Sequence, residues 1–250
     1  MKLTVTVITY NESEHISAAL DSVAWADEII VVDSGSTDAT VAIARTKATR
    51  VIERGWPGYS DQKNFAADNA SNEWVLSMDA DERVTPALAT EIRELLDDGP
   101  RLKGYRMKRV SHYLGRWIRS TDWFPDYQLR LYDRRAGRWN GLKIHESFQL
   151  NEGAPGVLTG EMEHYAYRNI SHHLQKIDAY TTLIADQWVG EGRQTSFLAL
   201  LLHPQFAFLR NYFIRRGFMD GTPGFVVSLL NSYYVFLKLA KLWERRHPQP

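Results

Sequence analysis

Cysteine is absent from this 250-residue chain, which excludes disulfides, thiolate zinc sites and cysteine nucleophiles. Glycine and proline, at 16 and 9 residues, are too few for a collagen-like or low-complexity chain. Hydrophobic residues make up 44% and charged residues 24% of the composition, so a mainly disordered chain is also excluded. What remains is a globular protein with one large α/β domain or two smaller ones.

A net charge is also absent, because 30 basic residues balance 30 acidic ones, but the charges are unevenly distributed. Residues 1–100 contain 8 basic and 18 acidic residues, whereas residues 193–250 contain 8 basic and 2 acidic residues. The acidic first part argues against nucleic acid as the main partner. The basic, aromatic C-terminal part favours an acidic surface, a membrane or a partner protein.

Other common sequence signals are missing as well. Neither of the glycine-rich phosphate-binding motifs follows the first predicted strand, which argues against kinases and dehydrogenases. Residues 1–10 contain one lysine and a strand-like alternation, so we expect no secretory signal there. The longest charge-free runs, 194–209 and 221–237, contain proline and are shorter than the ~20 residues of a membrane span. We expect interfacial or packed helices at these positions.

Strand and helix patterns alternate over the first hundred residues. Apolar and β-branched runs predict strands at 2–9, 28–33, 50–53 and 74–78, with helices between them. Asn11 is expected to cap the first helix, with Glu14 completing a capping box, and Thr85 to cap a helix that begins at Pro86. This order predicts an α/β fold with a mostly parallel, doubly wound sheet.

The second half of the chain changes character. Strands are expected at 105–110, 128–133 and 142–149, and the pattern is helical from Ser171 onward. We therefore predict a first domain at 1–165 and a helical C-terminal appendage at 166–250. The aromatic and basic runs of this appendage suit a membrane interface, and a helical cap or a dimer contact is the alternative.

Polar residues gather where the predicted parallel strands end, and doubly wound sheets bind their ligands at that edge. Asp33 ends the second strand, and Asp79 and Asp81 follow the fourth. These acids also have structural interpretations. Asp33 and Asp38 could belong to a capped turn, and Asp79 and Asp81 could be the acids at the start of a helix. Together on one edge, however, carboxylates require a cation or hydrogen-bond donors. The Asp-x-Asp spacing suits a hard divalent cation on one carboxylate and a hydroxyl group on the other.

Four segments in this region carry a family resemblance: VTVITYNE (5–12), VVDSGSTDAT (31–40), QKNFA (62–66) and LSMDADER (76–83). They resemble glycosyltransferase family 2, whose members are inverting sugar transferases with a GT-A fold. Later segments, among them RLYDRRAGRWNG (130–141), IHESF (144–148) and EHYAY (163–167), are similar to a narrower group. These are bacterial lipopolysaccharide-core enzymes that transfer glucose to an inner-core heptose.

The resemblance implies a UDP-sugar donor and a divalent cation, Mg²⁺ or Mn²⁺. The metal ligands would be Asp81 and His164. The donor would be held by Thr9, Tyr10 and Glu12 around the nucleotide base, Asp33 at the uracil, Lys63 near the base or the diphosphate, and Asp79 at the ribose.

The resemblance leaves the catalytic base open. The family order of glycine-containing loop, acidic residue and metal-binding histidine places the loop at 137–141 and the acid at Glu146. The Glu-Asp pair common in the family is replaced here by Ile-His-Glu, so Asp126, in an aromatic loop, is the rival base. His145 is expected to be structural or acceptor-binding. Lys63 and His164 also have structural alternatives, as a surface lysine and a core histidine.

The resulting prediction is an inverting hexosyltransferase that uses a UDP-sugar, with glucose as the first choice. Its acceptor would be a lipid-linked oligosaccharide, the inner-core heptose of lipopolysaccharide, at the cytoplasmic face of the bacterial inner membrane. One alternative is a metal-dependent nucleotidyltransferase, but residues 9–16 lack its basic, glycine-rich triphosphate loop. The other is a non-catalytic sugar-nucleotide-binding protein, against which the carboxylates of Asp79, Asp81 and Glu146 argue. The sequence leaves open whether the protein forms a homo-oligomer.

Overall fold

The computed structural model describes residues 1–141 and 146–247 of the chain. Its first part alternates strands and helices, in the order β1 (Leu3–Thr9), α1 (Ile16–Asp21), β2 (Glu28–Asp33), α2 (Thr40–Arg45), β3 (Arg50–Glu53), α3 (Tyr59–Asp68), β4 (Trp74–Asp79), β5 (Glu82–Val84) and α4 (Pro86–Asp98). Antiparallel strands follow, namely β6 (Gly104–Tyr113), β7 (Arg116–Ile118), β8 (Asp126–Asp133), β9 (Gly137–Trp139), β10 (Phe148–Leu150) and β11 (Gly156–His164). The C-terminal part is helical, with α5 (Ile170–Gly190), α6 (Phe197–Leu209), a π-helical turn (Arg210–Ile214) and α7 (Gly221–Arg246).

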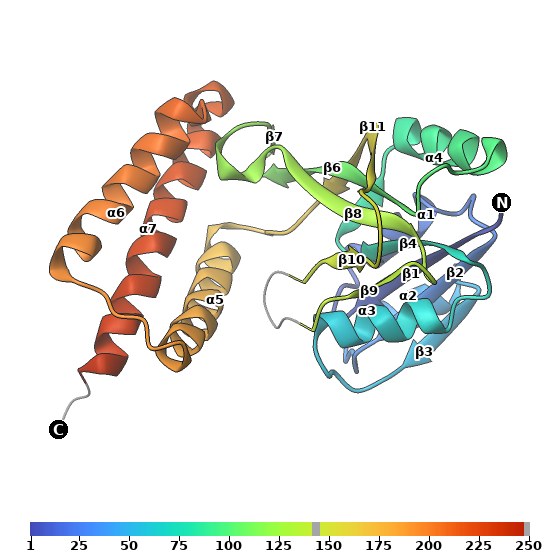
Figure 1. The fold of residues 1–250 in the computed structure, drawn as a ribbon, viewed down its shortest axis with the longest axis horizontal. Helices are drawn as coiled ribbons and strands as arrows, with labels where there is room; N and C mark the ends of the chain where they lie inside the picture. The colour runs from blue at the N-terminus through green and yellow to red at the C-terminus, as the bar shows by residue number, and fades with distance from the viewer. Residues whose placement is uncertain (142–145, 248–250) are drawn as a thin grey trace. The chain divides into compact units, whose positions relative to one another are not determined.

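One mixed sheet contains most of the described strands, in the order β3-β2-β1-β4-β8-β6-β11-β5, with β7 paired to β6 (Figure 1). The strands β1 to β4 are parallel, and β8 begins the antiparallel half. In the parallel register Thr9 lies opposite Asp33, and Ile8 lies opposite Asp79. The carboxyl ends of three neighbouring strands therefore meet at one edge, as the sequence predicts.

The central strand β1 is buried on both faces of the sheet, which explains its nearly continuous apolar sequence. Val5 and Val7 belong to a core cluster that includes Ile16 of α1 and Leu88 of α4. Ile8 belongs to a second cluster that includes Ala66 of α3. Helices thus cover both faces, and the edge at which the strands end is left to polar side chains.

The predicted α/β class, the parallel first strands and the C-terminal helices are confirmed. Thr85 caps α4 as predicted, since its hydroxyl accepts the Leu88 N–H at 3.3 Å. The predicted capping box at Asn11 is wrong, because α1 begins only at Ile16 and has no side-chain cap. Asn11 instead accepts the N–H of Thr37 at 2.8 Å, so a contact with the loop after β2 replaces the local cap.

The described chain divides into two compact units. The first contains residues 1–109 and 126–165, and the second contains residues 110–125 together with the chain from residue 166 onward. The division predicted after residue 165 stays a prediction about domains. The segment 110–125 belongs to the C-terminal unit although its sequence precedes β8.

An aromatic cluster in the second unit encloses His173 of α5. The His173 ring stacks on Tyr167 with 4.0 Å between centroids, and its Nδ1 lies 3.1 Å from the Tyr113 hydroxyl. Burial, together with the charges of Lys176 and His172, lowers the pKa of His173 to about 4. The neutral imidazole is therefore the form that the folded unit retains in weak acid.

This pKa predicts a loss of stability in weak acid. Between the ordinary histidine pKa of ~6.5 and the folded value of about 4, the unfolded chain binds a proton that the folded chain does not. The free energy of unfolding should therefore fall by up to ~3 kcal/mol as the pH drops through this window. Urea titrations at several pH values measure this slope. His173→Phe should flatten it, and an equally steep slope in the variant would contradict the assignment.

Candidate functional site

The site is built around the turn that joins β4 to β5. Asp79 ends β4, and its backbone N–H donates to the Glu82 carboxylate at 2.9 Å. Glu82 is fully buried at the start of β5. The antiparallel pairing of β5 with β11 places His164 opposite Glu82, and the Tyr165 N–H donates to the Asp81 carbonyl at 2.8 Å. The turn therefore holds Asp79 and Asp81 against the end of a strand that comes more than eighty residues later.

Seven side chains of alternating charge extend from this turn in both directions, and we refer to them as the charge chain. Lys63 Nζ lies 3.0 Å from Glu146 and 3.1 Å from Asp79. Arg130 Nη2 lies 2.9 Å from Asp79 and 3.0 Å from Glu82. Arg109 lies 2.9 Å from Glu82 and 2.8 Å from Asp126. The order along the charge chain is Glu146, Lys63, Asp79, Arg130, Glu82, Arg109 and Asp126.

Three members of the charge chain, Lys63, Arg130 and Glu82, are buried, whereas the other four are partly exposed. Lys63 and Glu82 are fully buried, but the side chains of Glu146 and Asp126 are 21% and 31% exposed. Burial alone would raise the pKa of Asp79, but the charges of Lys63 and Arg130 hold this pKa well below its usual range. The charge chain therefore contains an Asp79 that favours its ionised form, and Asp79 is partly accessible to solvent, as are the two terminal carboxylates.

A tryptophan lies beside the cations of the charge chain. The Trp139 ring centroid is 4.7 Å from Lys63 Nζ and 5.6 Å from the Arg130 guanidinium. Its indole N–H donates to the Tyr132 hydroxyl at 3.0 Å, and Asn64 of α3 hydrogen-bonds its backbone at 3.0 and 3.2 Å. These contacts fix the ring, so that the cations lie between carboxylates and an aromatic surface.

Asp81 and His164 form the pair that the sequence predicts for the metal. His164 Nε2 lies 3.6 Å from Asp81 Oδ2, and both side chains are mostly buried. The carboxylate oxygen suits Mg²⁺ or Mn²⁺, whereas the imidazole nitrogen is a ligand typical of transition metals and therefore favours Mn²⁺. Among the described residues no group of three or more acids and histidines is arranged to hold a metal ion. The remaining ligands of such an ion would have to come from a substrate and from water.

The predicted residues at the ends of β1 and β2 lie at the same edge but differ in exposure. Thr9 is buried, and Tyr10 is 56% exposed. The Glu12 N–H donates to the Thr40 hydroxyl at 2.8 Å. The buried Asp33 carboxylate accepts the N–H groups of Gly35 and Ser36 at 2.9 and 2.8 Å. Asp33 thus organises the turn that follows β2, and its role toward a nucleotide base stays a prediction.

The region predicted as a glycine-containing loop is partly a strand. Gly137 begins β9, which pairs with β10, and a Cβ at this glycine would lie 2.1 Å from the Gln149 carbonyl oxygen. Glycine is therefore required for close strand approach rather than for a flexible loop. Asn140 and Ser147 pair across the ends of the connection, and Glu146 lies beside them. His145 lies outside the described residues.

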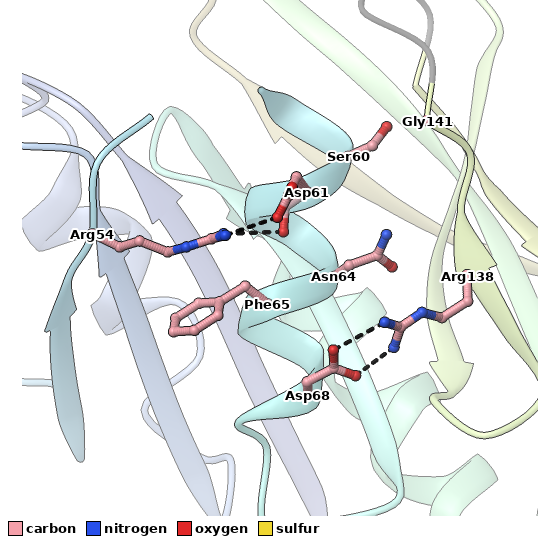
Figure 2. A pocket seen from close by; sticks show the side chains of 8 residues that line it. All are labelled: Arg54, Ser60, Asp61, Asn64, Phe65, Asp68, Arg138 and Gly141. Atoms are coloured by element: carbon pink, nitrogen blue, oxygen red, sulfur yellow. Dashed lines mark hydrogen bonds and ion pairs between the residues drawn. The ribbon is translucent and has the colours of Figure 1, made fainter. Parts of the chain in front are cut away.

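The first unit has a second polar feature, which shares Asn64 and Gly141 with the region just described. A hollow of about 460 Å³ borders α3 and is lined by Arg54, Ser60, Asp61, Asn64, Phe65, Asp68, Arg138 and Gly141 (Figure 2). Arg54 pairs with Asp61 at 2.9 Å, and Arg138 pairs with Asp68 at 3.0 Å. Each arginine is thus neutralised by an aspartate of the same hollow. None of the predicted donor, metal or base residues lines it.

Sequence reasoning missed three charged members of the site, Glu82, Arg109 and Arg130. Glu82 follows the Asp-x-Asp motif directly, and Arg130 lies between Leu129 and Leu131. A charge between two leucines was the available signal for Arg130, because a charged residue that is buried needs a partner. Lys63 is fully buried beside Asp79, so the alternative of a surface lysine is wrong, and its role toward the donor stays a prediction.

The chain is similar to a known family model, to curated proteins and to solved structures. Residues 4–151 match the family model described as Glycosyl transferase family 2. The lipopolysaccharide core biosynthesis glycosyltransferase LpsC of Rhizobium meliloti is 31% identical, over 98% of this chain and 93% of its own length. A crystal structure of S. aureus TarS, residues 1–349, superimposes with a TM-score of 0.49 at 16% identity, covering 100% of this chain and 92% of that one. Glucosyl-3-phosphoglycerate synthase of Mycobacterium tuberculosis, crystallised with Mn²⁺, UDP-glucose and phosphoglyceric acid, gives 0.39 at 24% identity over 43% of each chain.

Proposed function

The chain belongs to glycosyl transferase family 2, and on this premise we propose that it transfers a hexose from a UDP-sugar to a glycan acceptor with inversion at the anomeric carbon. The α/β fold with its C-terminal helices is GT-A-like. The observation that carries the proposal is the β4–β5 turn, where Asp79, Asp81 and His164 meet at the edge of the parallel strands. Ligands of such sheets bind at this edge.

The donor is proposed to bind along this edge. Tyr10 offers an exposed aromatic surface for a nucleotide base, and Asp79 offers ionised oxygens for the hydroxyls of a ribose. Lys63 and Arg130 supply positive charge beside Asp79. Asp81 and His164 would hold a Mg²⁺ or Mn²⁺ ion, which when bound stabilises the negative charge of the departing diphosphate.

The transfer step requires a base, because a sugar hydroxyl is a poor nucleophile. We assign this role to Glu146. The acceptor oxygen forms a bond to the anomeric carbon while the bond from that carbon to the diphosphate oxygen breaks. The hydroxyl proton passes to the Glu146 carboxylate, and the electron pair leaves with the UDP. Lys63 Nζ lies 3.0 Å from this carboxylate, which fixes its position at the end of the charge chain.

The acceptor is proposed to be a lipid-linked oligosaccharide, with the inner-core heptose of lipopolysaccharide as the first choice and glucose as the transferred sugar. Support comes from the similarity along nearly the whole chain to LpsC of Rhizobium meliloti, which is described as a lipopolysaccharide core enzyme. A panel of UDP-sugars in a thermal-shift experiment, with and without Mn²⁺, identifies the donor. Incubation of the preferred donor with heptose-containing core acceptors then identifies the product.

The proposed metal role makes a specific prediction. Asp81→Ala should weaken UDP affinity in the presence of Mn²⁺ by at least ~10-fold, because it removes one of two protein ligands. The fold should survive, since Asp81 is at a turn. Calorimetry of UDP binding with and without Mn²⁺ measures the effect. Asp21→Ala, which removes a 61% exposed carboxylate outside the site, is the matched control. Equal Mn²⁺-dependent affinity in Asp81→Ala and the control would show that the metal assignment is wrong.

A further inference from the structure

The second unit exposes an unusual amount of apolar surface on α6. Six large side chains of this helix are between 46% and 76% exposed, namely Phe197, Leu198, Leu201, Leu202, Phe206 and Leu209. The buried side of the helix is narrow and consists of Pro204 and Ala207. No charged residue occurs between Phe197 and Leu209. A surface helix of a soluble protein normally exposes its polar side, whereas α6 exposes apolar side chains.

The apolar surface continues along the chain into α7. In the connection between the two helices, Phe213, Ile214, Phe218 and Met219 are 50% to 70% exposed. On α7, Phe225, Leu229, Tyr233 and Phe236 are 42% to 50% exposed and recur at intervals of four, four and three residues. This spacing places them in one stripe of the helix. The two helices pack together, and the Ser232 hydroxyl of α7 donates to the Pro204 carbonyl of α6 at 2.7 Å.

The charges of this helical pair are almost all positive. From residue 197 to residue 247 there are seven lysines and arginines but only two acids. One of the acids, Asp220, is buried and accepts the Arg119 N–H at 2.9 Å. Arg215 and Arg216 are exposed at the connection, and Arg246 is exposed at the end of α7. Basic groups therefore flank an apolar surface at both ends.

We propose that this surface, from Phe197 to Phe236, docks on an anionic lipid bilayer and lies in its interface. Lipid accepts apolar side chains without matching their shapes, and anionic headgroups match the flanking arginines. The helical stretch Gly217–Arg246 is long and apolar enough to cross a membrane by length and composition. Its charge-free part, residues 221–237, however, spans only about 25 Å against ~30 Å of hydrocarbon. Lys241 and Arg245 also tie its end to Asp178 and Asp186 of α5, which favours docking over spanning.

Co-sedimentation of the full chain with vesicles tests the proposal. The wild type should sediment with vesicles of equal parts phosphatidylcholine and phosphatidylglycerol, and much less with phosphatidylcholine alone. Leu202→Gln with Phe206→Gln should reduce the partition by at least ~10-fold. Arg215→Gln with Arg216→Gln should reduce it by roughly 10–30-fold. Leu102→Gln with Val157→Gln, which changes two comparably exposed residues of the first unit, is the control and should bind like the wild type.

Three results would overturn the proposal. They are absence of vesicle binding, equal binding by all variants, and a dimer in solution that Leu202→Gln with Phe206→Gln dissociates. The last result would assign the surface to a second copy of the chain. The assay contains neither donor nor acceptor, so its outcome does not depend on the proposed transferase activity.

Discussion

Glu146→Gln is expected to lower the rate of sugar transfer by ~10²–10⁴-fold and to leave UDP-sugar binding nearly unchanged. Glutamine keeps the shape of the side chain and an oxygen that can accept the hydrogen bond of Lys63, which lies 3.0 Å from Glu146. It removes the ability to take a proton from the acceptor hydroxyl. A steady-state assay of sugar transfer, together with calorimetry of donor binding, separates these two effects.

Asp126→Asn is the matched comparison, because Asp126 occupies the opposite end of the charge chain. It is held there by Arg109 at 2.8 Å and by the Gln128 amide at 2.6 Å. If Glu146 is the base, Asp126→Asn should retain most of the activity that Glu146→Gln loses. A nearly active Glu146→Gln beside an inactive Asp126→Asn would move the base to Asp126 at the start of β8.

Arg130→Met is expected to lower the free energy of unfolding by ~3–5 kcal/mol. Arg130 is buried and lies at 2.9 Å from Asp79 and 3.0 Å from Glu82. Its removal would leave the four carboxylates of the charge chain with two cations, and Glu82 has no access to water. An ionised group that is buried without sufficient partners raises the free energy of the folded state. The variant should therefore be less stable than the wild type. Urea titration at neutral pH measures the change.

Arg138→Met provides the control for this prediction. Arg138 also pairs with an aspartate, Asp68 (Figure 2), but the two side chains are 59% and 50% exposed. Exposed ion pairs contribute only ~0–1 kcal/mol, since water and salt screen them. A loss in Arg130→Met no larger than the loss in Arg138→Met would show that Arg130 is not needed to compensate the buried carboxylates.

The edge of the parallel sheet was predictable because it depends on local patterns. Apolar runs that end in polar residues locate Asp33 and Asp79, and the parallel order of βαβ units brings them together. Asn11 shows the limit of such patterns, since its sequence context is that of a helix cap. In the structure its side chain accepts a hydrogen bond from Thr37, which is 26 residues away. A local sequence pattern cannot predict such a contact.

The charge chain could not be predicted from spacing. Its links join residues that are distant in sequence, such as Lys63 and Glu146, which are 83 residues apart. Another link, between Arg130 and Asp79, depends on the register of β8 on β4 in the antiparallel half of the main sheet. The resemblance identified Lys63, Asp79 and Glu146 individually, but not the cations and the buried Glu82 that connect them.

The charge chain also means that the side chains of this site are fixed when the protein folds and not when a ligand binds. Its side chains restrain one another within the protein alone, so a ligand that arrives at Asp79 does not have to immobilise flexible groups. The conformational entropy of fixing them is lost once, during folding, rather than in every binding event. The consequence is a site that is rigid at the cost of fold stability, since buried ion pairs are often less stabilising than apolar side chains of similar volume.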